Sequence, residues 1–456
     1  MHKPAPASLM RRKPSKQFRS HLPIFFIVVA SCLRVFACFQ HNPLDYLWSD
    51  SLRLWTDGTH FPRAGYYGAA DPILYQLYLS VLQHLTHNNR YFIALAAALM
   101  SVLMPWTYYR AARTFGVSKT PALWVWALIA CTPSLLTIYH FFMMETLLLL
   151  MEGFALWATA RYLRQGGTSP FLLMIVTWTL ASLTKPTVGP IAAVCVIWAC
   201  WKKHPAIRVV AAGAALAVTL LIPSAIRTEF GLGFIAPFGN PWFIKIQHRS
   251  GAKYIHVKFY SKSSELFHKQ RYVSDVWANS PSCDIRPLWP LSDWALRRAL
   301  APSTVTVSVD ADHGARDWKS AYEGLNVGVG EWLAQWRENI IFFFFAPSYP
   351  ESVVPQWDGR LEFYGRWLWA PLIIIVLSCN VRRFLRRQWD LIPVVVTLFT
   401  LFLLLQNVVT FEGRYRKPLE PLLLLNLVWI VAAPSDKPRE KAGAFQDDHE
   451  SAGTSG

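Results

Sequence analysis

The sequence predicts an all-α polytopic membrane protein with about ten transmembrane helices. The chain has 456 residues, of which 53% are hydrophobic and 14% aromatic. Only 16% are charged, whereas an average soluble chain has about 25%. Several apolar segments reach or approach the roughly 20 residues that a helix needs to cross a bilayer. These observations exclude an ordinary soluble fold.

The first apolar segment covers residues 21–39 and follows a basic N-terminus, residues 1–20. A basic stretch followed by an apolar one also describes a signal peptide. We interpret the segment as an uncleaved first span, because many more apolar segments follow it along the chain. The basic residues before it place the N-terminus in the cytoplasm.

Nine further apolar segments are expected to span the membrane. The distribution of basic residues in the connections between them indicates which connections lie in the cytoplasm. The segments are 91–109, 120–136, 142–160, 169–184, 187–201, 207–223, 366–380, 391–409 and 417–433. Arginines and lysines cluster after every second span, for example Arg110 and Arg113, Lys202 and Lys203, and Arg382 and Arg383. Cytoplasmic loops carry such an excess of basic residues. Ten spans with both termini inside satisfy this rule.

Residues 71–86 are apolar but are not interpreted as a transmembrane span, because the segment is too short to cross the bilayer. Counting it as a span would also move the Arg110 and Arg113 cluster to the outer side. We therefore expect an amphipathic helix on the outer membrane surface, within a first outer loop of residues 40–90.

A polar stretch of about 140 residues, 224–365, is expected on the outer face as a large loop or small domain. Helices are expected in it at 265–278 and 320–345, and the sequence leaves open whether 338–350 enters the bilayer. The transmembrane core then comprises residues 21–223, and 366–433 form the C-terminal spans. Residues 434–456 are expected to be a disordered cytoplasmic tail.

The net charge of +17 would suggest a nucleic-acid partner in a soluble protein. Here the basic residues lie beside apolar segments and no nucleic-acid motif is present, so membrane lipids are the expected partner. The seven cysteines show neither a disulfide framework nor a metal-binding CxxC spacing. We predict no cofactor, and the sequence does not support a divalent metal.

Several ionisable residues are predicted at the outer ends of the spans, where such groups indicate function. Carboxylates with cations at one interface suit a reaction that removes a proton and stabilises a phosphate. The carboxylates and cations are Asp45, Asp50, Glu145, Lys185, Glu412, Arg414, Arg416 and Lys417.

Structural roles compete with the functional interpretation. Lys185 would also suit the end of a helix hairpin or a contact with lipid headgroups, and Glu145 a solvated helix start. Arg414 and Arg416 would also suit anchoring at the interface. Asp57 precedes Gly58 and is expected in a turn. Arg34, late in the first span, is expected to snorkel outward or to pair with a loop carboxylate.

Five motifs resemble the multi-span GT-C glycosyltransferases, in particular the bacterial protein-mannosyltransferase and aminoarabinose-transferase group (glycosyltransferase family 39). The resemblance covers spans one to six and the last span. The motifs are SD before an aromatic-rich helix, DPILYQLYLSVL, METLLLLMEGFALWA, LASLTKPTVGPI and GRYRKPLEPLLLL.

The resemblance implies a sugar donor linked to polyprenyl phosphate of the undecaprenyl type, and a hydroxyl acceptor on a glycan, lipid or protein. It implies that Asp50 is the general base, with Asp45 or Glu145 orienting the acceptor. Lys185, Arg414 and Arg416 would then hold the lipid phosphate. Ser49–Asp50–Ser51 departs from the Asp-Glu pair of many relatives.

The expected function is therefore transfer of the sugar with inversion, on the periplasmic face of a bacterial inner membrane. Two alternatives remain open at this stage. One is a transporter or flippase of lipid-linked saccharides, although charges at one interface and a large loop are unusual for transporters. The other is a polysaccharide polymerase or ligase led by an arginine.

Overall fold

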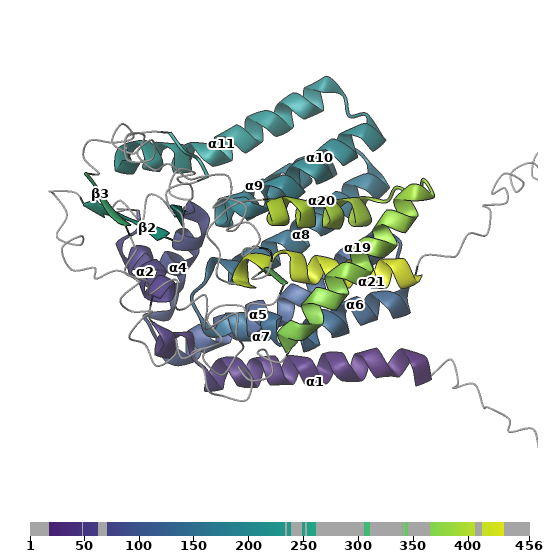
Figure 1. Cartoon of the computed structure of the whole chain (residues 1–456), viewed down its shortest axis with the longest axis horizontal. Coiled ribbons are helices and arrows are strands. Elements are labelled where there is room, and N and C mark those ends of the chain that lie inside the picture. Colours follow the sequence, from purple (N-terminus) through teal and green to yellow (C-terminus); the bar gives the residue numbers. More distant parts are fainter. Residues whose placement is uncertain are drawn as a thin grey trace, which may run out of the picture.

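The computed structural model is a bundle of long helices with shorter helices gathered at one end (Figure 1). The structure describes residues 18–47, 49–62, 71–232, 235–238, 249–250, 253–260, 305–310, 340, 343–344, 365–405 and 413–432. Each of the ten predicted apolar segments overlaps a helix of the bundle within the described residues. These helices are α1 (Phe18–Gln40), α5 (Arg90–Thr114), α6 (Lys119–Cys131) with α7 (Ser134–Thr137), α8 (Met144–Gln165), α9 (Thr168–Thr184), α10 (Gly189–Lys203), α11 (Ile207–Leu232), α19 (Trp369–Leu385), α20 (Leu391–Leu405) and α21 (Leu419–Ala432).

Within the described ranges, α1, α5 and α11 are long and apolar enough to cross a membrane. A fourth crossing is obtained if Lys119–Cys131 and Ser134–His140, which meet at 68°, form one bent span. α9, α20 and α21 are apolar but shorter. The chain is thus an integral membrane protein by its apolar helices, and the figure of ten crossings stays a prediction.

Two helices precede the second predicted span, and they pack on each other at one end of the bundle (Figure 1). They are α2 (Ser49–His60) and α4 (Ile73–Thr86). α4 confirms the expected helix at 71–86, and it buries Tyr75 and Leu79 on one side while Leu85 is exposed. We call this end of the bundle, where α1 ends and α8 begins, the first-loop end.

Local sequence explains how the chain turns at this end. Four short 3-10 helices lie in the connections: η1 (Pro43–Tyr46), η2 (Ile138–His140), η3 (Pro186–Val188) and η9 (Gly413–Arg416). Asn89 caps α5 by accepting a hydrogen bond from the Tyr91 amide at 2.9 Å. α9 ends at Thr184 because Pro186 disfavours the helical conformation for the residue before it, Lys185.

The apolar interior lies between α5, α6, α8, α9, α10 and the C-terminal helices, with Tyr108, Trp178 and Phe399 buried in it. A further 3-10 helix, η8 (Arg366–Leu368), precedes the C-terminal group of helices. Within the helices, Thr159 accepts a hydrogen bond from the Trp178 indole at 2.9 Å, joining α8 to α9.

The described part of the large polar stretch contains three strands, which the sequence interpretation did not predict. β1 (Arg249–Ser250) pairs antiparallel with β2 (Lys253–Tyr260), and β2 pairs parallel with β3 (Val305–Asp310). The strand order is β1-β2-β3. The helix expected at 265–278 and most of the helix expected at 320–345 lie outside the described residues. The helical class is confirmed for the bundle itself.

Candidate active site

Glu145 and Lys185 form a buried ion pair at the first-loop end. Glu145 is the second residue of α8, where its negative charge is favourable at a helix N-terminus. Lys185 is extended between α9 and η3. Lys185 Nζ lies 2.5 Å from Glu145 Oε1, and the two side chains are 9% and 1% exposed. The structure therefore joins two residues that the sequence predicted separately for the site.

The turn before α21 contributes an aromatic ring to the same pair. Lys185 Nζ lies 4.8 Å from the centroid of the Tyr415 ring, within range of a cation–π contact. Tyr415 belongs to η9, some 230 residues away along the chain. The sequence interpretation named its neighbours Arg414 and Arg416 and missed Tyr415, because a tyrosine between arginines has no distinguishing pattern.

Arg416 is buried rather than at the surface. Its Nε donates to Glu420 Oε1 at 3.0 Å, and its Nη1 donates to the carbonyl oxygen of Phe343 at 2.5 Å. Its guanidinium also lies 5.6 Å from the Trp369 ring. A side chain held on three sides in this way is not an interfacial anchor, so that alternative is wrong for Arg416.

Ser134, in the break between α6 and α7, joins the same buried cluster. Its hydroxyl donates to Glu420 Oε2 at 2.6 Å, so that both carboxylate oxygens of Glu420 are bound. Lys417 Nζ donates to the Ser134 carbonyl oxygen. The cluster thus links α7 to the start of α21 through side chains that are fully buried.

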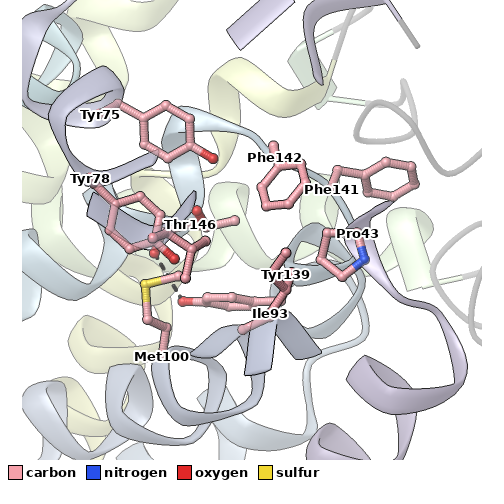
Figure 2. A pocket seen from close by; sticks show the side chains of 11 residues that line it. Pro43, Tyr75, Tyr78, Ile93, Met100, Tyr139, Phe141, Phe142 and Thr146 are labelled. Atoms are coloured by element: carbon pink, nitrogen blue, oxygen red, sulfur yellow. Dashed lines mark hydrogen bonds between the residues drawn. The ribbon is translucent and has the colours of Figure 1, made fainter. Parts of the chain in front are cut away.

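An aromatic pocket lies beside the ion pair, between α4, α5, η2 and the start of α8 (Figure 2). The Tyr139 hydroxyl donates to the carbonyl oxygen of Thr146, the residue after Glu145, at 3.2 Å. Burial raises the pKa of Tyr75 well above its ordinary value of 10.0, so this hydroxyl stays protonated. The pocket is lined by Pro43, Tyr75, Tyr78, Leu82, Ile93, Ala97, Met100, Tyr139, Phe141, Phe142 and Thr146.

α4 lines this pocket directly, and α2 contacts it through a stacked pair of rings. The Trp55 ring stacks on Phe142 with centroids 4.3 Å apart and planes inclined by 22°. Gln83 of α4 donates to the Trp55 carbonyl oxygen at 2.8 Å. The helix that carries Asp50 is therefore anchored three residues before Glu145.

The predicted first-loop carboxylates have different positions. Asp45 forms an ion pair of 2.7 Å with Arg90, and both side chains are more than a third exposed. The structure therefore gives Asp45 a surface pair that contributes little to stability. Asp50 is the second residue of α2 and Arg414 lies in η9, while the side chains of both are outside the described residues.

The expectation that Asp57 lies in a turn is wrong. Asp57 lies inside α2, which continues to His60, because the Asp-Gly pair does not interrupt the helix where Gly58 packs on Leu79. Burial raises the pKa of Asp57 above its ordinary value of 3.8, although Arg53 and Arg227 act in the opposite direction.

Neither expectation for Arg34 is correct either. Arg34 does not snorkel, because it is fully buried, and its five hydrogen bonds go to main-chain carbonyls and to the Ser101 hydroxyl rather than to a carboxylate. Three of these bonds go to main-chain carbonyls on the two sides of the break after α6, at Ile129, Ala130 and Leu135, and such carbonyls have no signature in the sequence.

Glu152 is a buried carboxylate that the sequence interpretation overlooked. It lies in α8 seven residues after Glu145, and therefore about 10 Å deeper in the bundle. The Tyr108 hydroxyl of α5 donates to Glu152 Oε2 at 3.0 Å. The available signal was an acid inside the apolar run LLLLMEGFALWA. In the described part of the chain, no three His, Cys, Asp or Glu side chains are grouped to hold a metal ion.

Comparison with known proteins gives one match. Residues 70–226 match the family model described as dolichyl-phosphate-mannose-protein mannosyltransferase, a family of GT-C type glycosyltransferases. The matched segment is about a third of the chain and runs from α4 into α11. No curated protein and no solved structure matches the chain significantly. The predicted resemblance is confirmed, and the match implies membrane glycosyltransferase activity of the GT-C type.

Proposed function

We propose that the chain transfers a sugar from a polyprenyl-phosphate donor to a hydroxyl acceptor on the outer face of a bacterial inner membrane. The observation that carries this proposal is the buried Glu145–Lys185 pair beneath Tyr415. It lies at the first-loop end, inside the segment that matches the glycosyltransferase family. The name of that family specifies a sugar linked to a lipid phosphate as the donor.

Asp50 is the proposed general base. The acceptor oxygen attacks the anomeric carbon while Asp50 removes the hydroxyl proton, and the bond from that carbon to the phosphate oxygen breaks. Polyprenyl phosphate leaves with the bonding electrons, and the configuration at the anomeric carbon inverts. The docking of α2 through Trp55 on Phe142 supports this role, because it fixes the helix of Asp50 beside α8.

Lys185 is the proposed direct contact of the donor phosphate. An ammonium group has three donors, and a buried position strengthens its attraction for developing phosphate charge. Glu145 fixes the ammonium in place by its 2.5 Å contact, and so Glu145 is proposed to position Lys185 and the acceptor. Asp45 is the alternative partner for the acceptor.

Arg414 and Arg416 complete the proposed phosphate site. Two donor atoms of Arg416 are bound to Glu420 and to the Phe343 carbonyl. Its proposed contribution is therefore positive charge close to the phosphate and the correct placement of η9, which also carries Arg414 and Tyr415. The large stretch 224–365 is proposed to select the acceptor.

The test is the substitution Asp50→Asn, which keeps the size of the side chain and removes the base. Mass spectrometry of envelope lipids and glycans, with and without the protein, first identifies the accumulated lipid-linked sugar and the missing product. We then expect Asp50→Asn to lose transfer of that sugar by at least about 100-fold, since general bases contribute 10²–10⁴-fold.

The matched control is Asp390→Asn, because Asp390 pairs with Arg383 in the connection between α19 and α20, outside the site. It should keep transfer within about twofold of wild type, at equal amounts of folded protein. Substantial transfer by Asp50→Asn would refute the assignment of the base. Unchanged lipids and glycans in cells without the protein would refute the proposed function.

A further inference from the structure

We propose that Arg34 is a positioning residue for donor binding, because it holds the α6–α7 break in the shape that places Ser134 against Glu420 and Arg416. The inference rests on the proposed function, in which Arg416 and its helix η9 form part of the phosphate site. Arg34 lies in α1, outside the segment that matches the family model.

Arg34 binds both sides of the break. Its Nε donates to the Ala130 carbonyl at 2.8 Å and its Nη2 to the Ile129 carbonyl at 2.9 Å, at the end of α6. Its Nη1 donates to the Leu135 carbonyl of α7 at 2.9 Å. The last carbonyls of a helix have no partner within it, and burial makes such orphan groups costly. Arg34 supplies those partners at a bend of 68°.

A third helix fixes the guanidinium group itself. Arg34 Nη1 also contacts Ser101 of α5, at 2.9 Å from its hydroxyl oxygen and 3.1 Å from its carbonyl oxygen. A planar guanidinium with five N–H donors can satisfy acceptors in several directions, whereas a lysine ammonium cannot reach them all. The geometry of the break therefore depends on an arginine at position 34.

The break transmits this geometry to the proposed phosphate site. Ser134 lies between Ala130 and Leu135, whose carbonyls Arg34 holds, and its hydroxyl donates to Glu420 at 2.6 Å. Glu420 in turn accepts from Arg416 Nε at 3.0 Å. A shift of the break moves Ser134, and Glu420 and Arg416 must follow or lose these bonds.

The first test is Arg34→Lys, compared with Arg110→Lys as the matched control. Arg110 lies at the opposite end of α5 from Asn89 and contacts the rings of Trp106 and Trp157. We expect Arg34→Lys to raise the KM for the lipid-phosphate donor about tenfold and to leave the acceptor KM within about twofold. A merely structural role would reduce the amount of active protein without changing either KM.

A double-mutant cycle tests whether Arg34 acts through the break. Ser134→Ala should raise the donor KM in the same way, and adding it to Arg34→Lys should cost less than the product of the two single effects. Ser101→Ala removes one of the five hydrogen bonds and should raise the donor KM about two- to threefold. Full multiplicativity in the cycle would overturn the proposal. If Arg34→Lys fails to fold, Ser101→Ala and Ser134→Ala still decide the matter.

Hydrogen–deuterium exchange separates this inference from the proposed function, because it needs no substrate. We expect Arg34→Lys, or Ser101→Ala to a smaller extent, to speed exchange both in residues 129–137 and in residues 413–420. Faster exchange in both segments without any sugar transfer by the wild type would refute the function and retain the coupling. Transfer with unchanged donor KM, and exchange altered in 129–137 alone, would retain the function and refute the positioning role.

Discussion

The Glu145–Lys185 pair is the residue-scale feature on which the proposed chemistry depends. Taking two charges out of water is expensive, and their attraction offsets this cost only when both are present. A buried ion pair is therefore weak evidence for stability as such. Its position between α8 and the α9–η3 turn supports a functional reason for having it.

A pair of substitutions separates the two roles. Lys185→Met should lower the free energy of unfolding by about 3–5 kcal/mol, because it leaves Glu145 buried without its cation. Adding Glu145→Leu should restore most of that stability, since both charges are then gone. Transfer should remain at least about 100-fold below wild type in both variants. Thermal melts in detergent and the transfer assay measure these effects, and recovered transfer in the double variant would leave Lys185 with a structural role only.

The buried carboxylate of Asp57 makes a prediction about pH. Its pKa is raised by burial above 3.8, so the protonated form is favoured in the folded state. The protonated carboxyl therefore contributes to the free energy of unfolding. This contribution is fully present below a pH of about 3.8 and is lost as the pH rises through the folded-state pKa. Asp57→Asn cannot ionise and retains the neutral form. Its Tm relative to wild type should therefore rise from pH 4 to pH 7, and a falling difference would contradict the raised pKa.

At the scale of the elements, the sequence predicted the helices well because long apolar runs determine them. It also predicted, from the Lys-Pro pair, that Lys185 lies in a turn between two apolar segments. The partners of Arg34 could not be predicted, because every residue has a main-chain carbonyl and the sequence does not show which carbonyls are left unpaired at a helix break. Asp57 was misplaced because Asp-Gly is typical of turns, whereas helix packing determines the conformation here.

Gly58 determines how closely α2 and α4 approach. A Cβ atom at this position would lie 2.8 Å from Leu79 Cβ, which is closer than side chains tolerate, and 3.4 Å from the Leu79 carbonyl carbon. Gly58→Ala should therefore push α2 away from α4 and cost about 1–3 kcal/mol. Because Asp50 lies on α2, transfer should fall by more than this loss of folded protein explains.

Gly189→Ala is the matched control for this substitution. Gly189 begins α10, and a Cβ atom there would meet no other atom within 4 Å. The control should be neutral or slightly stabilising, because alanine is the better helix former. Equal effects of the two substitutions on transfer would contradict the role of the α2–α4 contact.

At the scale of the whole molecule, charge and geometry agree on one orientation. Glu145, Lys185 and η9 lie at the first-loop end, whereas Lys202 and Lys203 end α10 at the other end of the helix that follows Lys185. The positive-inside rule places such basic ends in the cytoplasm. The site would then face outward, where a lipid-linked donor in the outer leaflet is accessible.

Cysteine labelling in intact cells tests this orientation. Cys283 lies in the stretch 224–365 that is expected on the outer face, and it is first replaced by serine. Single cysteines are then introduced by Leu85→Cys at the first-loop end and Lys203→Cys at the other. Both residues are exposed in the structure. An impermeant maleimide should label position 85 in intact cells, and position 203 only after the membrane is permeabilised.

The Cys283→Ser protein without an added cysteine serves as the control for the remaining native thiols, several of which lie in α1, α6 and α10. Labelling of both positions from outside would indicate an even number of crossings between them, and it would contradict the five crossings that the ten-span threading requires. Labelling of position 203 alone in intact cells would indicate the opposite orientation in the membrane. The proposed site would then face the cytoplasm. The predicted pattern requires five crossings from residue 85 to residue 203, namely α5, α6 with α7, α8, α9 and α10. An odd number of crossings places the two positions on opposite sides, which is the feature of the ten-span threading that this experiment decides.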